Sequence, residues 1–177
     1  MQVALSSRSF NSAVCAYRLW QCGYYQQAIM IVRHLDEDAL YGHQIGKGVP
    51  AVLDSLWELK RPSKTLPKMA EDLGDVYFVN WREAYDTMSE LAHTRWLALG
   101  VQLQGDKVRT GPVWDGPLAH FTLAQLLACT GQMAVVAVVA AEAAAGFSGK
   151  AVQLLGPVSE VIYAWFDAHA PQWDCQA

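Results

Sequence analysis

The segment Tyr25-Gln-Gln-Ala-Ile-Met-Ile-Val-Arg-His-Leu-Asp-Glu37 opens the helical pattern that decides the fold. Residues three and four apart share one face of an α-helix, so regularly spaced apolar residues predict an amphipathic helix over 25–46. Arg33 and Glu37 are four apart and border this apolar stripe. The stripe consists of Ala28, Ile31, Val32, Leu35, Ala39 and Gly42.

Helical spacing extends on both sides of this segment. A first helix is expected to begin at Ser7 or Ser9, either of which is a suitable N-cap, and to end near Gly23, forming an antiparallel hairpin with the second. Residues 100–114 predict a long loop or small hairpin. We therefore expect an all-α, multi-helix bundle forming a single domain over 1–177. The further helices predicted are 50–59, 67–73, 80–99, 115–145 with Asp115 as N-cap, and 148–169.

Composition limits the classes of function. The chain has 177 residues, 53% of them hydrophobic and 17% charged, which favours a large core or a partner surface over disorder. The net charge of −4 gives no general attraction to phosphate backbones, so strong DNA binding is not predicted. The four cysteines form no C-x-x-C motif, and residues 1–9 do not resemble a secretory signal, so we expect a cytoplasmic protein with reduced thiols.

The stretch from Phe121 to Ala141 carries no charge and is long enough to span a bilayer. Gln125, Thr130 and Gln132 lie inside it, Glu142 follows directly, and no Lys/Arg cluster flanks it. We therefore interpret it as a central bundle helix that is apolar on nearly all sides because neighbouring helices surround it. Association with a membrane is kept as an alternative.

Signatures of nucleotide binding, serine hydrolysis and zinc proteolysis are not found in the sequence. One Glu-x-x-His motif, Glu90-Leu-Ala-His93, lacks the second copy that a carboxylate-bridged bundle site would use, although Asp36, Glu37 or Asp38 would offer carboxylates. We predict no metal and no cofactor.

Two polar patterns carry a family resemblance. Gly23-Tyr-Tyr-Gln-Gln-Ala28 leads to Arg33-x-x-x-Glu37, and a later helix contains Tyr85-x-x-x-Ser89-Glu-x-x-His93. Over residues 10–145 the chain resembles a HEPN-like family of uncharacterised bacterial helical proteins. The resemblance implies a four-helix core, often dimeric, in families that include ribonuclease toxins and phage-defence proteins.

The chain departs from the ribonuclease members of that family, whose active site has an Arg and a later His separated by four to six residues. Arg33 directly precedes His34, while Arg82 lies eleven residues before His93. A rearranged site would use His93 as general acid/base and Arg33 to stabilise charge on the phosphorane, with Glu37, Tyr85 and Ser89 in binding roles. We favour the other interpretation, in which these five residues form a hydrogen-bond network that fixes helix register.

Three hypotheses follow for the function. The first is a non-catalytic interaction or small-ligand-binding protein acting as a homodimer, whose seven Trp and seven Tyr partly line a groove or interface. The second is a metal-independent ribonuclease or toxin that acts on RNA through His93 and Arg33. The third is a membrane-associated helical protein.

Overall fold

The computed structural model describes residues 2–49, 52, 58, 64–93, 103–104, 107–108, 111–112, 115–145, 160 and 164. These residues form the all-α bundle that the sequence predicts, together with one minimal hairpin in the 100–114 segment. The elements are α1 (Gln2–Gln21), α2 (Tyr25–Gly46), α4 (Leu66–Glu71), α5 (Asp75–Ala92), β1 (Leu103–Gln104), β2 (Lys107–Val108) and α7 (Gly116–Ala145). The predicted helices over 50–59 and 148–169, and residues 94–99, lie outside the described residues apart from isolated positions.

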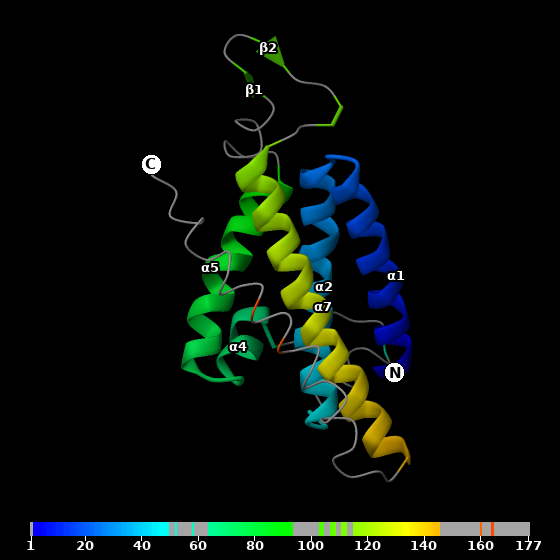
Figure 1. Cartoon of the computed structure of the whole chain (residues 1–177). Coiled ribbons are helices and arrows are strands. Elements are labelled where there is room, and N and C mark those ends of the chain that lie inside the picture. The colour runs from blue at the N-terminus through cyan, green and yellow to red at the C-terminus, as the bar shows by residue number, and fades with distance from the viewer. Residues whose placement is uncertain are drawn as a thin grey trace.

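Helix α2 is the centre of the described bundle. It packs against α1, α4, α5 and α7, and Figure 1 shows it behind α7, with α1 and α5 on either side. The sequence predicts that the helix over 115–145 is central. Among the described helices, however, the central position belongs to α2 and not to α7. The physical reason is that α2 buries side chains around most of its circumference, including two aspartates, because each neighbour offers it an apolar or hydrogen-bonding surface.

Two apolar clusters divide the core along α2. The N-terminal half contributes Ile29, Val32 and Leu35 to a cluster shared with α1, α5 and α7. The C-terminal half contributes Leu40 to a second cluster, which includes Met69 of α4 and Trp81 of α5. The C-terminal half of α5 meets the N-terminal half of α2, where Arg33 contacts Tyr85 and His93, so the two polar sequence patterns come together.

Helix α1 begins at Gln2, so the expectation of an N-cap at Ser7 or Ser9 is wrong. The Ser9 hydroxyl lies inside the helix and shares its one proton between the Leu5 carbonyl oxygen, 2.8 Å away, and Asp38 Oδ2, 2.9 Å away. Because this hydroxyl is satisfied within and between helices, it does not end the helical pattern. The predicted turn to α2 is confirmed, with Gly23 at φ 77°.

Both ends of the helix predicted over 80–99 are corrected: α5 ends at Ala92, because the backbone of His93 is extended. Helix α5 begins at Asp75, five residues earlier than expected, directly after Gly74 with its φ of 115°. The Asp115 cap is confirmed, because its Oδ1 accepts from the Leu118 backbone N–H at 2.9 Å. In the predicted hairpin, β1 and β2 pair antiparallel with Leu103 opposite Val108.

Helix α7 is long and apolar enough, over Gly116–Ala141, to cross a membrane, a test that core helices of soluble proteins also pass. A third of this window is buried within the described bundle. Gln132, inside the apolar stretch, accepts a hydrogen bond from the Tyr77 hydroxyl of α5 at 3.0 Å. Gly42 lets α7 approach α2 closely, since a Cβ there would lie 2.5 Å from Val136 Cγ1.

Candidate functional site

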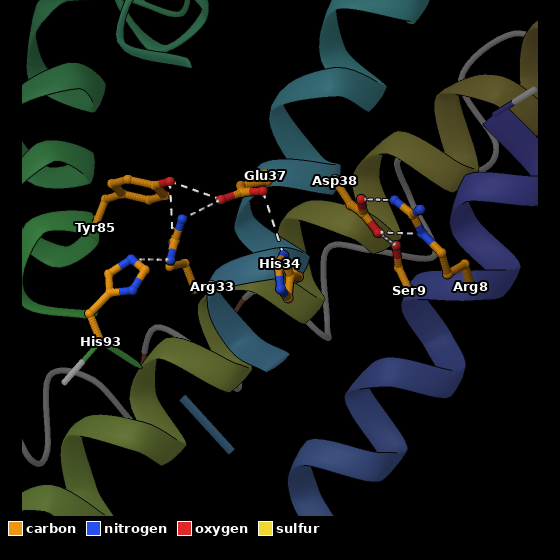
Figure 2. Close-up of polar contacts among 8 residues, drawn as sticks. All are labelled: Arg8, Ser9, Arg33, His34, Glu37, Asp38, Tyr85 and His93. Atoms are coloured by element: carbon orange, nitrogen blue, oxygen red, sulfur yellow. Dashed lines mark hydrogen bonds and ion pairs between the residues drawn. The ribbon is translucent and has the colours of Figure 1, made fainter. Parts of the chain in front are cut away.

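Four of the five predicted site residues meet where α2 and α5 cross. Arg33 lies at the centre: its Nε donates to the Tyr85 hydroxyl at 3.2 Å, and its NH2 lies 3.2 Å from Glu37 Oε1. Tyr85 in turn donates to Glu37 Oε1 at 2.8 Å. The third guanidinium nitrogen, NH1, lies 3.1 Å from His93 Nε2 (Figure 2). We call Arg33, Glu37, Tyr85 and His93 the Arg33 network.

The charges in the Arg33 network compensate one another. Burial opposes the positive charge of Arg33, but the Tyr85 hydroxyl and the Glu37 carboxylate outweigh it and raise the pKa of the guanidinium. Burial also raises the pKa of Tyr85, and the Glu37 carboxylate adds to this effect. The phenol therefore stays protonated and remains a hydrogen-bond donor to Glu37. The guanidinium carbon also lies 5.3 Å from the centroid of the Tyr85 ring, within cation–π range.

His93 forms the exposed end of the network, at the C-cap of α5. A guanidinium has only donors, so the His93 Nε2 accepts and the neutral imidazole carries its proton on Nδ1. Ser89 is not brought into the network through its side chain: within the described part of the chain, its contribution is the backbone carbonyl, which accepts from the His93 N–H at 3.1 Å.

A second polar cluster lies on the opposite side of α2. The buried Asp38 accepts from Ser9 and pairs with Arg8, whose Nε lies 3.2 Å from Asp38 Oδ2 (Figure 2). Arg8 itself is 65% exposed, so this pair ties α1 to α2 at the surface of the bundle. This pair was not predicted from the sequence. An Arg and an Asp on two different helices give no spacing signal.

A pocket of about 370 Å³ opens between α2, α5 and α7, beside the Arg33 network. We call it the Asp36 pocket. Its volume is at the lower end of the range for small-molecule sites, roughly 300–1,000 Å³. The residues lining it are Asp36, Tyr77, Asn80, Trp81, Ala84, Met88, Gln125, Ala128, Cys129 and Gln132.

Asp36 is the buried charged group of this pocket, with only 3% of its surface exposed. The Trp81 indole Nε1–H donates to its Oδ2 at 2.5 Å, and the Cys129 Sγ lies 4.0 Å from its Oδ1. Burial raises the pKa of Asp36 to about 7, and the charge of Glu37 adds to this, while the Trp81 hydrogen bond acts in the opposite direction. Burial and the nearby Asp36 also raise the pKa of Cys129.

Each carboxylate in the run Asp36-Glu37-Asp38 thus has a different hydrogen-bond partner. Successive residues project about 100° apart around a helix, so Asp36 faces α5 and α7, Glu37 faces Tyr85 of α5, and Asp38 faces α1. The three carboxylates therefore do not converge on one point. Over the described residues, no group of three or more His, Cys, Asp or Glu side chains is placed to hold a metal ion.

Sequence reasoning missed the Asp36 pocket, although a signal was present. Asp36 lies four residues after Val32 and three before Ala39, inside the apolar stripe rather than beside it. A charged residue at a core position predicts either a buried pair or a site.

No family model, no curated protein and no solved structure matches this chain. The resemblance to HEPN-like proteins therefore stays a prediction.

Proposed function

We propose that this protein is a non-catalytic module that binds a small ligand in the Asp36 pocket. The observation that carries the proposal is a concave site with mostly apolar walls and one deeply buried carboxyl group among a few polar side chains. Sites for small molecules have this composition, because apolar walls supply affinity and a few polar groups fix orientation.

The Arg33 network supports this proposal as a structural element of the pocket wall. The Tyr85 ring stacks on Trp81 with centroids 4.8 Å apart, and Trp81 lines the pocket and holds Asp36. Because Tyr85 is anchored to Arg33 and Glu37 of α2, the network fixes the register of α5 against α2. Its hydrogen-bonding groups are mostly used by one another, which suits a positioning role better than a catalytic one.

The test of this proposal is ligand-detected NMR with a fragment mixture containing amines, alcohols, carboxylic acids and amides. Ala84→Phe places a ring in the pocket, while Val79→Phe adds the same ring to the same helix at a position that is 62% exposed. We expect at least one fragment class to bind the wild-type and Val79→Phe proteins but not Ala84→Phe. The proposal is rejected if no fragment distinguishes the two variants, provided both retain the helical circular dichroism of wild type.

A second candidate function, a metal-independent ribonuclease, is favoured by the contact between Arg33 NH1 and His93 Nε2. In this role, His93 would move a proton to or from the attacking 2′-hydroxyl, and Arg33 would stabilise the charge of the phosphorane. Against it, the guanidinium is already paired with Glu37, which reduces its attraction for a phosphate.

The ribonuclease candidate is tested by RNA cleavage and by growth inhibition on expression. If it is correct, His93→Ala and Arg33→Ala each abolish both effects, while His120→Ala, which removes an exposed imidazole on α7, leaves them unchanged. This candidate is rejected if the double variant His93→Ala/Arg33→Ala cleaves RNA or inhibits growth as strongly as wild type.

A further inference from the structure

We infer that the ligand of the Asp36 pocket is a small organic cation, a primary amine with an apolar body, whose ammonium group pairs with the Asp36 carboxylate. This inference rests on the proposed function and adds the chemical class of the ligand. It follows from the charges lining the pocket, the unfilled hydrogen-bonding capacity of Asp36 and the shape of the apolar walls.

The charge of the pocket wall is one-sided. Asp36 is its acidic residue, and no Lys, Arg or His is among the described residues that line it. Neighbouring cations are engaged elsewhere: Arg33 pairs with Glu37, and Arg8 pairs with Asp38. A buried carboxylate is normally paired with a cation, because the loss of hydration is otherwise uncompensated. A ligand that enters this pocket with a positive charge supplies the missing partner.

The geometry at Asp36 leaves one oxygen available. Oδ2 accepts a short hydrogen bond from the Trp81 indole, whereas the one contact of Oδ1 within the described part of the chain is with the Cys129 thiol, 4.0 Å away and a weak donor. An ionised carboxylate can accept about four hydrogen bonds. An ammonium group donates a charge-assisted hydrogen bond, which is stronger than the bond from a neutral hydroxyl, so it suits the acceptor capacity at Oδ1 better.

The rest of the pocket fits the uncharged part of such a ligand. Ala84, Met88 and Ala128 provide an apolar wall from α5 and α7. Asn80 is exposed and marks the opening, so the amine enters first and a substituent on the far end of the body reaches solvent. An acid of the same shape would place a second negative charge beside Asp36 and is excluded by repulsion.

The experiment compares phenethylamine with its neutral counterpart 2-phenylethanol, by isothermal titration calorimetry on the full chain at pH 8. We expect phenethylamine to bind at least tenfold more tightly than the alcohol to wild type. Asp36→Asn, which keeps an acceptor for Trp81, is expected to remove this preference and leave the alcohol unaffected. Val79→Phe serves as the control and keeps the preference.

A pH series provides a readout that a purely structural role of Asp36 would not move. The titratable groups around Asp36 are Glu37 on α2, Tyr77 on α5 and Cys129 on α7. The charged groups on the other two neighbouring elements contact other residues. Arg8 of α1 pairs with Asp38, and Asp72, which follows α4, accepts from Gln44. Burial raises the pKa of both Tyr77 and Cys129, so they stay neutral from pH 6 to 8. Because the pKa of Asp36 is about 7, amine affinity should fall about tenfold from pH 8 to pH 6, with release of a proton on binding.

The outcomes separate this inference from the function on which it rests. Equal affinity for the amine and the alcohol in wild type, with loss of both in Ala84→Phe, overturns the amine inference and retains the pocket as a ligand site. Binding of carboxylic acids in preference to amines likewise overturns the amine inference and retains the pocket as a ligand site. If no fragment class binds in an Ala84-dependent way, both proposals fail. The comparison of amine and alcohol uses the wild-type protein, so it tests the inference even if a variant does not fold.

Discussion

The guanidinium of Arg33 and the imidazole of His93, sixty residues apart in the chain, lie 3.1 Å apart and are joined by a hydrogen bond. The bond connects the side of α2 to the end of α5, with His93 Nε2 as the acceptor. The same guanidinium also contacts Glu37 and Tyr85, so its donors are directed to three partners in the protein. This arrangement indicates a connection that fixes helix register, next to the pocket in which we place the function.

Removing the Tyr85 hydroxyl tests this stabilising role. Tyr85→Phe keeps the stacking on Trp81 but removes the donor to Glu37 and the acceptor for Arg33. Because both partners are charged, we expect the free energy of unfolding to fall by about 2 kcal/mol. Urea denaturation followed by circular dichroism measures this change. The matched control, Arg82→Gln on the same helix, breaks an ion pair whose side chains are about 70% exposed and should change stability by less than about 0.5 kcal/mol. Equal effects of the two substitutions would contradict the role of the network.

Stability should depend on pH through Asp36. Folding raises the pKa of this carboxyl group from its usual 3.8 to about 7, so the folded chain holds the proton more tightly than the unfolded chain. Its contribution to stability is therefore fully present below pH 3.8 and is lost as the pH rises through 7. We expect wild type to lose about 4 kcal/mol from pH 4 to pH 8 relative to Asp36→Asn, which has no such proton. Parallel pH profiles of the two proteins in urea denaturation would show that Asp36 is not shifted.

Close packing of α2 and α7 at Gly42 predicts an unusual sign for a glycine substitution. Alanine in the middle of a helix is normally more stable than glycine by about 1 kcal/mol. At position 42, however, the added Cβ would lie 2.5 Å from Val136 Cγ1, so we expect Gly42→Ala to destabilise the protein by about 1–3 kcal/mol. The double variant Gly42→Ala/Val136→Ala should recover part of this loss. Gly116→Ala, where nothing lies within 4 Å of the new Cβ, is the control. A stabilised Gly42→Ala protein would show that the two helices are further apart.

The predicted homodimer remains a prediction and has a defined test. Phe10, Val14 and Tyr17 share one face of α1 and are 69%, 45% and 43% exposed, which makes them the apolar surface on which we expect a second copy to pack. Phe10→Asp should then shift the mass measured by light scattering from dimer to monomer. Asn11→Asp adds the same charge at the next, exposed position and should leave the mass unchanged. A wild-type protein that is monomeric at every concentration would rule out the homodimer.

The positions of most described helices, and the polar residues that share a face of one helix, were predictable from local sequence. The stripe from Ala28 to Gly42 places α2 correctly from residue 25 to residue 46, and Asp115 marks the start of α7. The spacing of Arg33 with Glu37, and of Tyr85 with His93, predicts residues that share a face on each helix. Four of the five residues proposed from these patterns do converge.

The pocket was not predictable in the same way, because it depends on packing between helices. The place of Asp36 inside the apolar stripe indicates burial, but no local rule says which side chains of other helices surround it or that they leave a cavity. The environments of Asp36 and Asp38 are determined by Trp81, Cys129 and Ser9, which come from three other helices. The start of α1 was misplaced for a related reason, since Ser9 satisfies its hydroxyl through a partner on α2 rather than as a cap.

The most direct test of the account follows the indole N–H of Trp81 in ¹H–¹⁵N NMR spectra during titration with phenethylamine. The indole N–H donates to Asp36 inside the pocket. Its signal can be identified among those of the seven tryptophans, because it is missing from the spectrum of Trp81→Phe. We predict that the Trp81 signal shifts in a saturable manner while the ring signals of His93 do not move. A titration that shifts His93 and leaves Trp81 unchanged would contradict the account, because the ligand would then bind at the Arg33 network instead of the Asp36 pocket.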